Sequence, residues 1–471
     1  MTILTKGVQP ASELLGRARP EWLEQWGLFA SRLSFSDLSG EVLARAKLVL
    51  LDTIGVIAAG MQEPEMRKLA ARLAAGDDGA PVIGTGRRAP TATAAFLNGT
   101  AGTMLELEEG NQYARGHPGI HVVPAALAAA ETLRASGARL LAAIVLGYEI
   151  GARIGIASRL RVTMHPHGTW GSVGAALAVA YLDGADAERM IETINLSSTL
   201  GLATSRRTML EGGTVRNSYA GFSNQLGLTA FDLVASGFIG ETDGVGTVYG
   251  GVVADQFEPR EMVAELGARF EIARNYFKRH AACRYTHGAL DALDDILRRA
   301  GSDLDPASIE TIEVDTYVWA AQLDSPQPKN MLAAKFSLPF VLATRLVHGA
   351  ADLEAFREEA LRSAPVRDLA RRVVLREDLR LTAMLPHFRP ARLRLTLRDG
   401  RQFAAEALTN KGDTEDPYSD AEVRAKFRAL ATPVFGIDAA QRLERLADEL
   451  GTLADVGPLC RALAAPLAQE H

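Results

Sequence analysis

The strongest constraint on the fold is a series of apolar stretches with helical spacing that fills the first half of the chain. Apolar residues recur every three or four positions in six stretches, which cover residues 43–59, 92–107, 124–133, 140–156, 170–182 and 187–200. Several of these stretches are rich in Ala and Gly, as in Ala125–Ala130. Small side chains let helix backbones approach closely, so the pattern predicts a tightly packed, largely buried helical domain.

The pattern changes after about residue 271. Ile309–Tyr317 and Ala391–Ala405 alternate apolar and polar residues, which is typical of strands, and Asp399–Gly400 suits a tight hairpin turn. Residues 338–349, between these two stretches, have a helical pattern. The segment therefore predicts a smaller unit that mixes helix and strand.

The C-terminal part, residues 420–463, returns to an amphipathic helical pattern. We expect these helices to pack back on the first domain, which makes that domain discontinuous. The predicted fold is mostly α. A large helical domain comprises residues 1–271 and is completed by 409–471, and a smaller α+β domain, residues 272–408, is inserted into it.

Charge and cysteine content exclude several classes of protein. The 471 residues carry 51 Lys and Arg against 57 Asp and Glu, a net charge of −6, which offers no global footprint for nucleic acid. Cys283 and Cys460 are too few for a disulfide framework and fit a reducing compartment. The N-terminus lacks a signal-like apolar core, and we find no uninterrupted run of about 18 apolar residues. We expect a cytoplasmic protein without a membrane span.

Six of the nine histidines fall in three short segments. These six are His117 and His121, His165 and His167, and His280 and His287. In two of the segments a His–Pro step holds the histidine out of the α-helical region, which places it on a loop at the mouth of a helix. Such histidines are better placed for chemistry than histidines inside a helix, although a structural role in the turn remains open for each.

Acidic and basic groups accompany these histidines. Glu106, Glu108 and Glu109 lie upstream of His117, and a carboxylate beside an imidazole can orient it and raise its basicity. Basic residues gather in three places despite the acidic total. They are Arg206 and Arg207, Arg216, and the run of Arg274, Lys278, Arg279 and Arg284. Because guanidinium groups bind carboxylates in a bidentate manner, this set indicates a small polyanionic substrate and proton-transfer chemistry.

No spacing in the chain matches a zinc template, although His165, His167 and Glu106 are suitable ligand types. The Gly-rich segments Gly84–Gly86 and Gly240–Gly251 lack the rest of any phosphate-binding fingerprint. We therefore expect no metal and no nucleotide cofactor.

Taken together and in order, several landmarks resemble the MmgE/PrpD family over most of the chain. They include LLDTIGVIAAG (50–60), AAFLNGTAGTMLELEEG (94–110), GHPGIHVVPAALAAAE (116–131), LGYEIGARIG (146–155), HPHGTWGSVGAALA (165–178), RNSYAGFSNQLGLTAFDLVASGFIG (216–240), KRHAACRYTHGALDAL (278–293), KFSLPFVLATRLVHG (335–349) and GDTEDPYSDAEVRAKF (412–427).

The resemblance implies a cofactor-independent enzyme that acts on a small polycarboxylate, as 2-methylcitrate dehydratase, cis-aconitate decarboxylase and iminodisuccinate epimerase do. It also implies a homodimer with an active-site cleft between a helical and an α+β domain. The family's catalytic histidines correspond to His117 and His165, its catalytic lysine to Lys278, and its acidic position to Glu106. Our predicted substrate-binding residues are Arg216, His167, Arg207, Arg284 and His287.

The sequence departs from the family pattern at five places. Glu106 stands where Asp is usual, Arg216 replaces a lysine, and Tyr219 replaces a histidine. Arg279, His280 and Ala281 replace the Pro-Tyr-Pro that follows the lysine, and Phe340 stands where Tyr is frequent. An arginine is always protonated, so Arg216 can bind an anion but cannot accept a proton.

The leading hypothesis is a lyase that removes a proton next to a carboxylate and expels water, or stabilises the carbanion left by decarboxylation. His165 or His117 would be the base, with Lys278 and Arg216 as carboxylate clamps. Two alternatives stay open at this point. One is an epimerase of a dicarboxylate on the same site, and the other is a non-catalytic or metal-binding relative.

Overall fold

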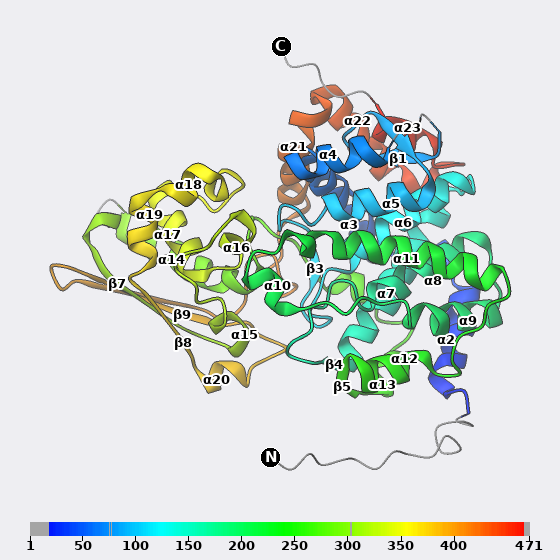
Figure 1. Cartoon of the computed structure of the whole chain (residues 1–471), viewed down its shortest axis with the longest axis horizontal. Coiled ribbons are helices and arrows are strands. Elements are labelled where there is room, and N and C mark those ends of the chain that lie inside the picture. The colour runs from blue at the N-terminus through cyan, green and yellow to red at the C-terminus, as the bar shows by residue number, and fades with distance from the viewer. Residues whose placement is uncertain (1–17, 75, 77, 302–303, 466–471) are drawn as a thin grey trace.

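The apolar stretches of the first half pack together as one helical lobe in the computed structural model, which describes residues 18–74, 76, 78–301 and 304–465 (Figure 1). The longer helices of this lobe are α2 (Glu21–Arg32), α3 (Gly40–Gly60), α4 (Pro64–Leu73), α5 (Thr91–Ala101), α6 (Pro118–Thr132), α7 (Gly137–Ala157), α8 (Gly171–Asp183), α9 (Ala187–Ser198) and α11 (Ser218–Ala235). Shorter ones are α10 (Arg206–Leu210), α12 (Gly244–Thr247) and α13 (Pro259–Val263).

The C-terminal helices pack on this lobe. They are α21 (Asp420–Phe435), α22 (Ile437–Asp448) and α23 (Gly457–Leu463). The first of them, α21, lies along α3, and α22 contacts both α21 and α3, so helices from the early and late parts of the described chain share one lobe (Figure 1). Lys426 on α21 forms an ion pair of 2.6 Å with Asp52 on α3, which ties the two helices together in the lobe interior.

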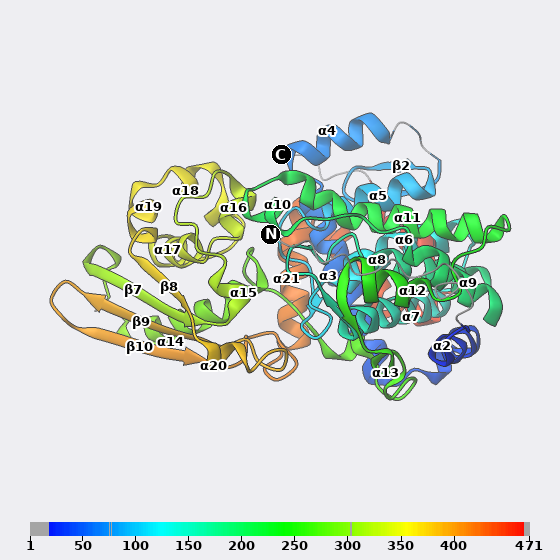
Figure 2. The same ribbon diagram turned by 60° about the horizontal axis from the view of Figure 1, so that its bottom comes forward.

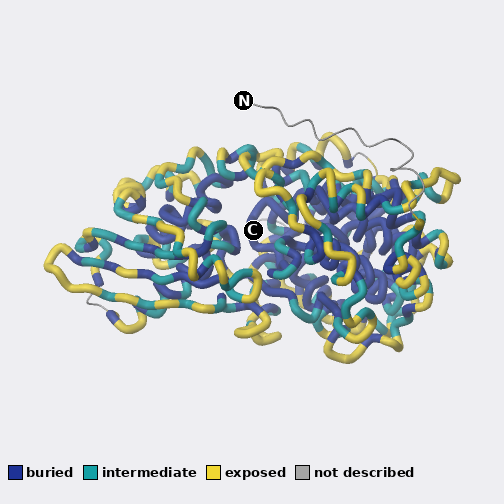
Figure 3. Tube along the Cα trace, turned by 90° about the horizontal axis from the view of Figure 1, so that it is seen from below, coloured by how far each residue is buried: buried dark blue, intermediate teal, exposed yellow. Residues whose placement is uncertain are grey.

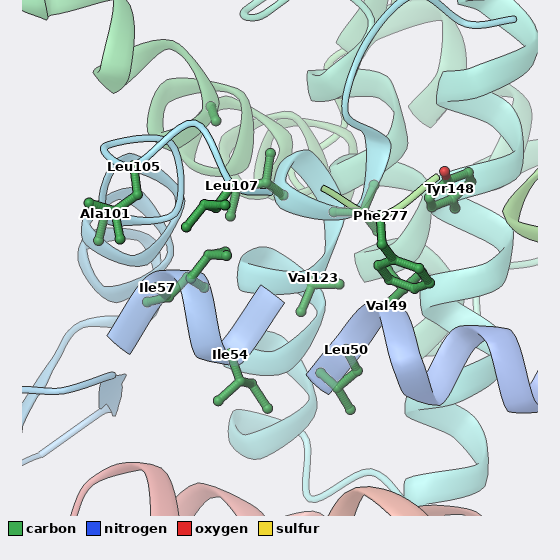
Figure 4. Close-up of a cluster of buried hydrophobic side chains, with 14 of the residues drawn as sticks. Val49, Leu50, Ile54, Ile57, Ala101, Leu105, Leu107, Val123, Tyr148 and Phe277 are labelled. Carbon is green, nitrogen blue, oxygen red and sulfur yellow. The ribbon is translucent and has the colours of Figure 1, made fainter. Parts of the chain in front are cut away.

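The helices α6, α7 and α8 are buried along almost their whole length and, together with α3 and α5, form the centre of the helical lobe. Figure 4 shows part of this core, where Val49 and Ile54 of α3 lie among Leu105, Val123 and other buried side chains. Helix α7 is long and apolar enough to cross a membrane by length and composition, yet 94% of its 18-residue window is buried within the protein. Its apolar character therefore serves the core of this lobe.

A small mixed sheet organises the second lobe, which confirms the mostly helical fold with a strand-containing unit. Its strands are β7 (Ile309–Thr316), β8 (Val373–Glu377), β9 (Ala391–Leu397) and β10 (Gln402–Ala407), in the order β10-β9-β7-β8. The β9–β10 hairpin contains the predicted Asp399–Gly400 turn, and Gly400 has a φ of 87°, which favours glycine. Strand β8 runs parallel to β7, whereas the other pairs are antiparallel.

Helices accompany the sheet of this smaller lobe. They are α14 (His287–Ala300), α15 (Val318–Ala321), α16 (Met331–Lys335), α17 (Leu338–His348), α18 (Glu358–Arg362), α19 (Ala364–Ala370) and α20 (Leu379–Thr382). Alternate residues of β9, including Leu393 and Leu395, are buried, and α14 contacts β9 and β10 (Figure 2). Figure 3 shows that buried residues fill the helical lobe more completely than the end of the smaller lobe, where the hairpin is exposed.

The helical lobe also contains three short strand pairs, of which the first is local and the other two connect distant segments. They are β1 (Ala80–Val82) with β2 (Arg87–Ala89), β3 (Gly110–Asn111) with β6 (Asn275–Tyr276), and β4 (Ser158–Leu160) with β5 (Ala254–Phe257). Strand β6 follows the predicted boundary at residue 272 and pairs with β3 of the helical lobe. The β3–β6 pair also holds the acidic segment next to the segment that carries Lys278.

Candidate active site

The helix predicted over 92–107 is wrong at its C-terminal end, because α5 stops at Ala101. Beyond it, the Thr103 hydroxyl donates to a backbone carbonyl in the segment before α11, at 2.6 Å. Lys335 Nζ donates to the carbonyls of the two residues before Glu106, at 3.4 and 3.0 Å. These bonds hold the backbone outside a helix, and Glu106 has a left-handed φ of 56° that costs energy for a residue other than glycine. The acidic segment is thus a buried loop.

His117 lies at the start of α6, directly before the first helical residue, Pro118. Its Nδ1 is 2.7 Å from the backbone carbonyl oxygen of Glu109. A carbonyl oxygen only accepts hydrogen bonds, so Nδ1 carries the proton and the lone pair of a neutral ring is on Nε2. The helix predicted from residue 124 begins at Pro118 instead, which places His117 at its mouth.

The Glu109 side chain fixes this arrangement from behind. Its carboxylate accepts hydrogen bonds from the backbone N–H of Gly119 (2.7 Å), the Tyr148 hydroxyl (3.0 Å) and the Asn275 amide (3.1 Å). Burial raises the pKa of Glu109 to about 7. Glu109 therefore ties the acidic loop to the N-terminus of α6 and, through its carbonyl, sets the tautomer of His117.

His165 and His167 lie on the loop between β4 and α8. The backbone N–H of His167 donates to His165 Nδ1 at 3.1 Å, so the proton of a neutral His165 is on Nε2. That Nε2 is 3.4 Å from the Nε of Arg216. Because a neutral imidazole cannot accept at both nitrogens, the shorter backbone contact decides the tautomer. His165 and Arg216 then present two N–H donors to the same space.

The site contains four histidines in edge-to-face contact. The ring of His167 lies 5.0, 4.9 and 4.8 Å, centroid to centroid, from the rings of His117, His121 and His165. Burial lowers the pKa of His117 and of His121 to about 3. Burial, together with the nearby charge of Arg216, lowers the pKa of His165 and His167 well below the usual range. All four rings are therefore neutral near pH 7.

Buried charges compensate one another beside the histidines. Arg216 forms an ion pair with Glu106, and both side chains are almost fully buried. Lys278 Nζ lies 3.6 Å from Glu106 Oε2 and 3.7 Å from Glu108 Oε2. Glu108 also lies 3.8 Å from His117 Nδ1. Two cations and two carboxylates therefore form one network, which fixes the Arg216 side chain in place.

Most of the predicted site residues line one cavity of about 60 Å³, which we call the histidine cavity. Its lining includes the predicted residues Glu106, His117, His165, His167, Arg216 and Arg284. It also includes Arg115, Arg206, Tyr276, Cys283, Tyr285, Phe336 and Arg389. The lining comes from both lobes, so the cavity lies between them.

Three predicted residues lie elsewhere. Arg207 extends into solvent with 81% of its side chain exposed and pairs with Glu211, so the structure does not support it as a substrate-binding residue. His287 lies behind Arg284, with its Nδ1 3.1 Å from a guanidinium nitrogen. Lys278 is buried behind the two carboxylates and contributes to a separate cavity of about 610 Å³. Lys278 could bind a substrate carboxylate, as predicted, only if its contacts with Glu106 and Glu108 were broken.

Two of the departures from the family pattern also take up positions outside the histidine cavity. Phe340 is fully buried in the smaller lobe, with its ring centroid 6.2 Å from that of Phe356. Tyr219 is half-buried, its hydroxyl lies 3.3 Å from the Thr208 hydroxyl, and its ring lies 6.0 Å from His165.

Sequence reasoning missed several cations of the site. Arg206 lines the cavity in place of its neighbour Arg207, because only one of two adjacent helical residues faces inward. Arg115 precedes His117 by two residues, and this closeness in sequence could have identified it as a site residue. Arg389 has no predicted site residue near it in the sequence, so no local signal could have identified it. Lys335 opens the segment KFSLPF, and burial lowers its pKa to about 8.

One group of residues has the geometry of a metal site. Glu108, His117 and His167 each offer one ligand atom, and these atoms lie within 4.8 Å of one another. Their ligand types suit zinc, and long-range folding brings them together in a way that local spacing does not reveal. A bound dication would also face the ammonium group of Lys278, 3.7 Å from Glu108. The absence of a metal stays a prediction.

Comparison with known proteins places these features in a family context. The MmgE/PrpD N-terminal domain matches residues 24–259, and the MmgE/PrpD C-terminal domain matches residues 280–452. A cis-aconitate decarboxylase-like protein of Aspergillus oryzae is 28% identical over 93% of this chain and 96% of the relative. Cis-aconitate decarboxylases of Aspergillus terreus and Mus musculus are 26% and 24% identical, over 93% of this chain and 95% and 92% of the relatives.

Proposed function

The chain belongs to the MmgE/PrpD family, and we propose that it is a lyase that acts on a small polycarboxylate without a cofactor. The observation that carries the proposal is the contact of 2.7 Å between His117 Nδ1 and the Glu109 carbonyl oxygen. It leaves the lone pair on Nε2 of a neutral, cavity-lining histidine, which is the form that a general base needs.

The proposed base is therefore His117, whereas the sequence favoured His165 as the base, with His117 as the next candidate. His165 carries its proton on Nε2 and suits the opposite role, that of a hydrogen-bond or proton donor. Because the pKa of His117 is lowered to about 3 by burial, the ring is available as a base across the physiological range.

Arg216 and His165 form the proposed anion clamp. Arg216 Nε and His165 Nε2 lie 3.4 Å apart, and a substrate carboxylate placed beside both nitrogens would accept hydrogen bonds from the two side chains. Removing the proton next to that carboxylate moves negative charge onto its oxygens. Fixed donors stabilise this enediolate-like anion more than the ground state, and this difference accelerates the reaction.

Water loss and decarboxylation place different demands on this site. In dehydration, His117 Nε2 takes the proton from the α-carbon, and the resulting His117 imidazolium gives this proton to the β-hydroxyl group, which leaves as water. In decarboxylation, the C–C bond breaks to release CO2, and the resulting carbanion takes the proton of His165 Nε2–H, which a proton from solvent then replaces. The names of the relatives favour testing decarboxylation first.

The test is a panel of di- and tricarboxylates, including cis-aconitate, assayed for CO2 release, for formation or loss of a double bond, and for epimerisation. Each assay is run with and without a chelator. We expect lyase turnover that is insensitive to the chelator and that His117→Gln lowers by about 10³-fold. Epimerisation alone would favour the isomerase alternative, and loss of activity with the chelator would indicate the metal group at Glu108. No turnover of any acid, with the protein folded, would contradict the proposal.

A further inference from the structure

A second cavity of about 320 Å³ adjoins the histidine cavity and shares Arg115, Pro166, Arg206 and Tyr285 with it. We call it the arginine antechamber. Its lining also includes Arg159, Arg161, Asp255 and Trp319. A ligand in the histidine cavity can therefore extend into the antechamber past the shared side chains.

The antechamber has an excess of positive charge. Four of its lining residues are arginines and one is an aspartate, and that aspartate, Asp255, lies 3.5 Å from Arg161. Arg115, Arg159 and Arg206 have no carboxylate within 4.0 Å among the residues that the structure describes. Arg206 even has two buried guanidinium nitrogens, Nε and Nη2, without a hydrogen-bond partner in the described structure. Buried donors without partners are costly, and an anionic ligand would satisfy them.

The opposite wall of the antechamber is aromatic and comes from the smaller lobe. The rings of Tyr285 and Trp319 are stacked, with centroids 5.8 Å apart and an interplanar angle of 28°. Arg206 lies over Tyr285 at 5.9 Å, and Arg115 lies over Trp319 at 6.0 Å. Flat rings next to guanidinium groups bind flat anions, because the ring surface packs against the carbon skeleton while the guanidinium groups take the charge.

We propose that the antechamber is a binding subsite for a flat, anionic arm of the substrate. This inference deepens the proposed function. It assigns the enzyme an extended polycarboxylate, with one carboxylate between Arg216 and His165 and a second anionic group, on an unsaturated or aromatic skeleton, between Arg159, Arg206 and the rings of Tyr285 and Trp319.

The test uses binding alone and therefore does not depend on turnover. Of the four tryptophans, Trp22, Trp26 and Trp170 are buried, whereas Trp319 is half-buried, so its fluorescence can report on the antechamber. The probes are benzene-1,3,5-tricarboxylate, which is flat, and propane-1,2,3-tricarboxylate, which has three carboxylates and no ring. We expect saturable quenching by the flat probe, with a dissociation constant at least about fivefold lower than that of the flexible probe.

Variants make the assignment specific. Arg159 is an exposed residue outside the histidine cavity. We expect Arg159→Gln to raise the dissociation constant of the flat probe at least about threefold, and Arg206→Gln to raise it more. Arg207→Gln removes the same charge from the neighbouring, solvent-exposed residue and should change the dissociation constant less than twofold. Trp319→Phe should remove the signal. Circular dichroism verifies that each variant is folded.

Equal affinities for the two probes would overturn the inference, as would equal effects of Arg159→Gln and Arg207→Gln. If the flat probe binds as expected but no polycarboxylate is turned over, the subsite stands and the proposed lyase reaction fails. If compact acids are turned over and the flat probe does not bind, the reaction stands and the subsite fails.

Discussion

The histidine cavity and the arginine antechamber share Arg115 and Arg206, and the comparison that matters is between cations paired with a carboxylate and cations without one. In the histidine cavity, Arg216 is paired with Glu106, and Arg284 with Asp413 at 2.5 Å. Arg206, on the shared wall, and Arg159, in the antechamber, have no acidic partner among the described residues, whereas Arg161 of the antechamber lies 3.5 Å from Asp255. The four clustered histidines next to Arg216 are neutral, because burial lowers their pKa.

The difference separates two tasks that an enzyme for polyanions has to perform. A charge that stabilises a transition state needs a fixed position before substrate arrives, and the carboxylate of Glu106 provides this for Arg216. A cation that captures substrate is most effective when no carboxylate of the protein is paired with it, because the anionic substrate then becomes its partner. A cleft with an excess of positive charge also raises the rate at which an anionic substrate encounters the enzyme. The predictions below test this division between the two cavities.

The largest effect is expected at the base. His117→Gln should lower kcat by about 10³-fold, within the range of about 10² to 10⁴ that general bases contribute, and should change KM little. His165→Gln should lower kcat less, because its role as a donor is shared with Arg216. His348→Gln, at an exposed histidine of the smaller lobe, is the control. Steady-state kinetics on the substrate with the highest kcat/KM measures these losses. A larger loss of kcat from His165→Gln than from His117→Gln would contradict the assignment of His117 as the base.

The second prediction compares a paired cation with an unpaired one. Arg216→Gln leaves Glu106 buried with only Lys278 nearby, so we expect a loss of about 3–5 kcal/mol in the free energy of unfolding. Arg206→Gln removes a cation that has no acidic partner, and the loss should be under about 1 kcal/mol.

Urea unfolding of the two variants measures this difference, and the double variant Glu106→Gln/Arg216→Gln should recover part of the loss because no carboxylate is then stranded. Similar losses for Arg216→Gln and Arg206→Gln would show that pairing with a carboxylate does not distinguish the two cations.

The smallest expected effect concerns pH. His121 has a pKa of about 3 in the folded protein against about 6.5 when unfolded, so the unfolded chain binds more protons between these values. The contribution of the neutral His121 ring to the free energy of unfolding is therefore fully present above pH 6.5, and it is lost as the pH falls from about 6.5 to about 3. Glu109, with its pKa raised to about 7, has the opposite effect, since its protonation favours the folded state.

His121→Gln isolates the histidine contribution, because His121 does not line the histidine cavity. Between pH 6 and 4, the free energy of unfolding of the variant should depend on pH less steeply than that of the parent, by about 1.4 kcal/mol per pH unit. Parallel curves for the two proteins would mean that His121 is not held neutral by burial.

Much of the fold could be predicted because its signals are local. Helical spacing predicted α3, α7, α8 and α9, and alternation with an Asp-Gly pair predicted the β9–β10 hairpin. The same reasoning failed where long-range contacts compete with local preference. Residues after Ala101 have a helical pattern, but bonds from Thr103 and Lys335 hold this backbone in a loop.

The sequence by itself determined which chemical groups the protein has and, through the resemblance to the MmgE/PrpD family, which of them were expected in one site. The homodimer stays a prediction. Only the tertiary structure decided how these groups act. It turned Arg206 inward and Arg207 outward, placed Lys278 behind Glu106, and set the proton of His117 on Nδ1 through the Glu109 carbonyl. The physical reason is that protonation and ion pairing depend on atoms a few ångströms away in space, which a linear pattern does not encode.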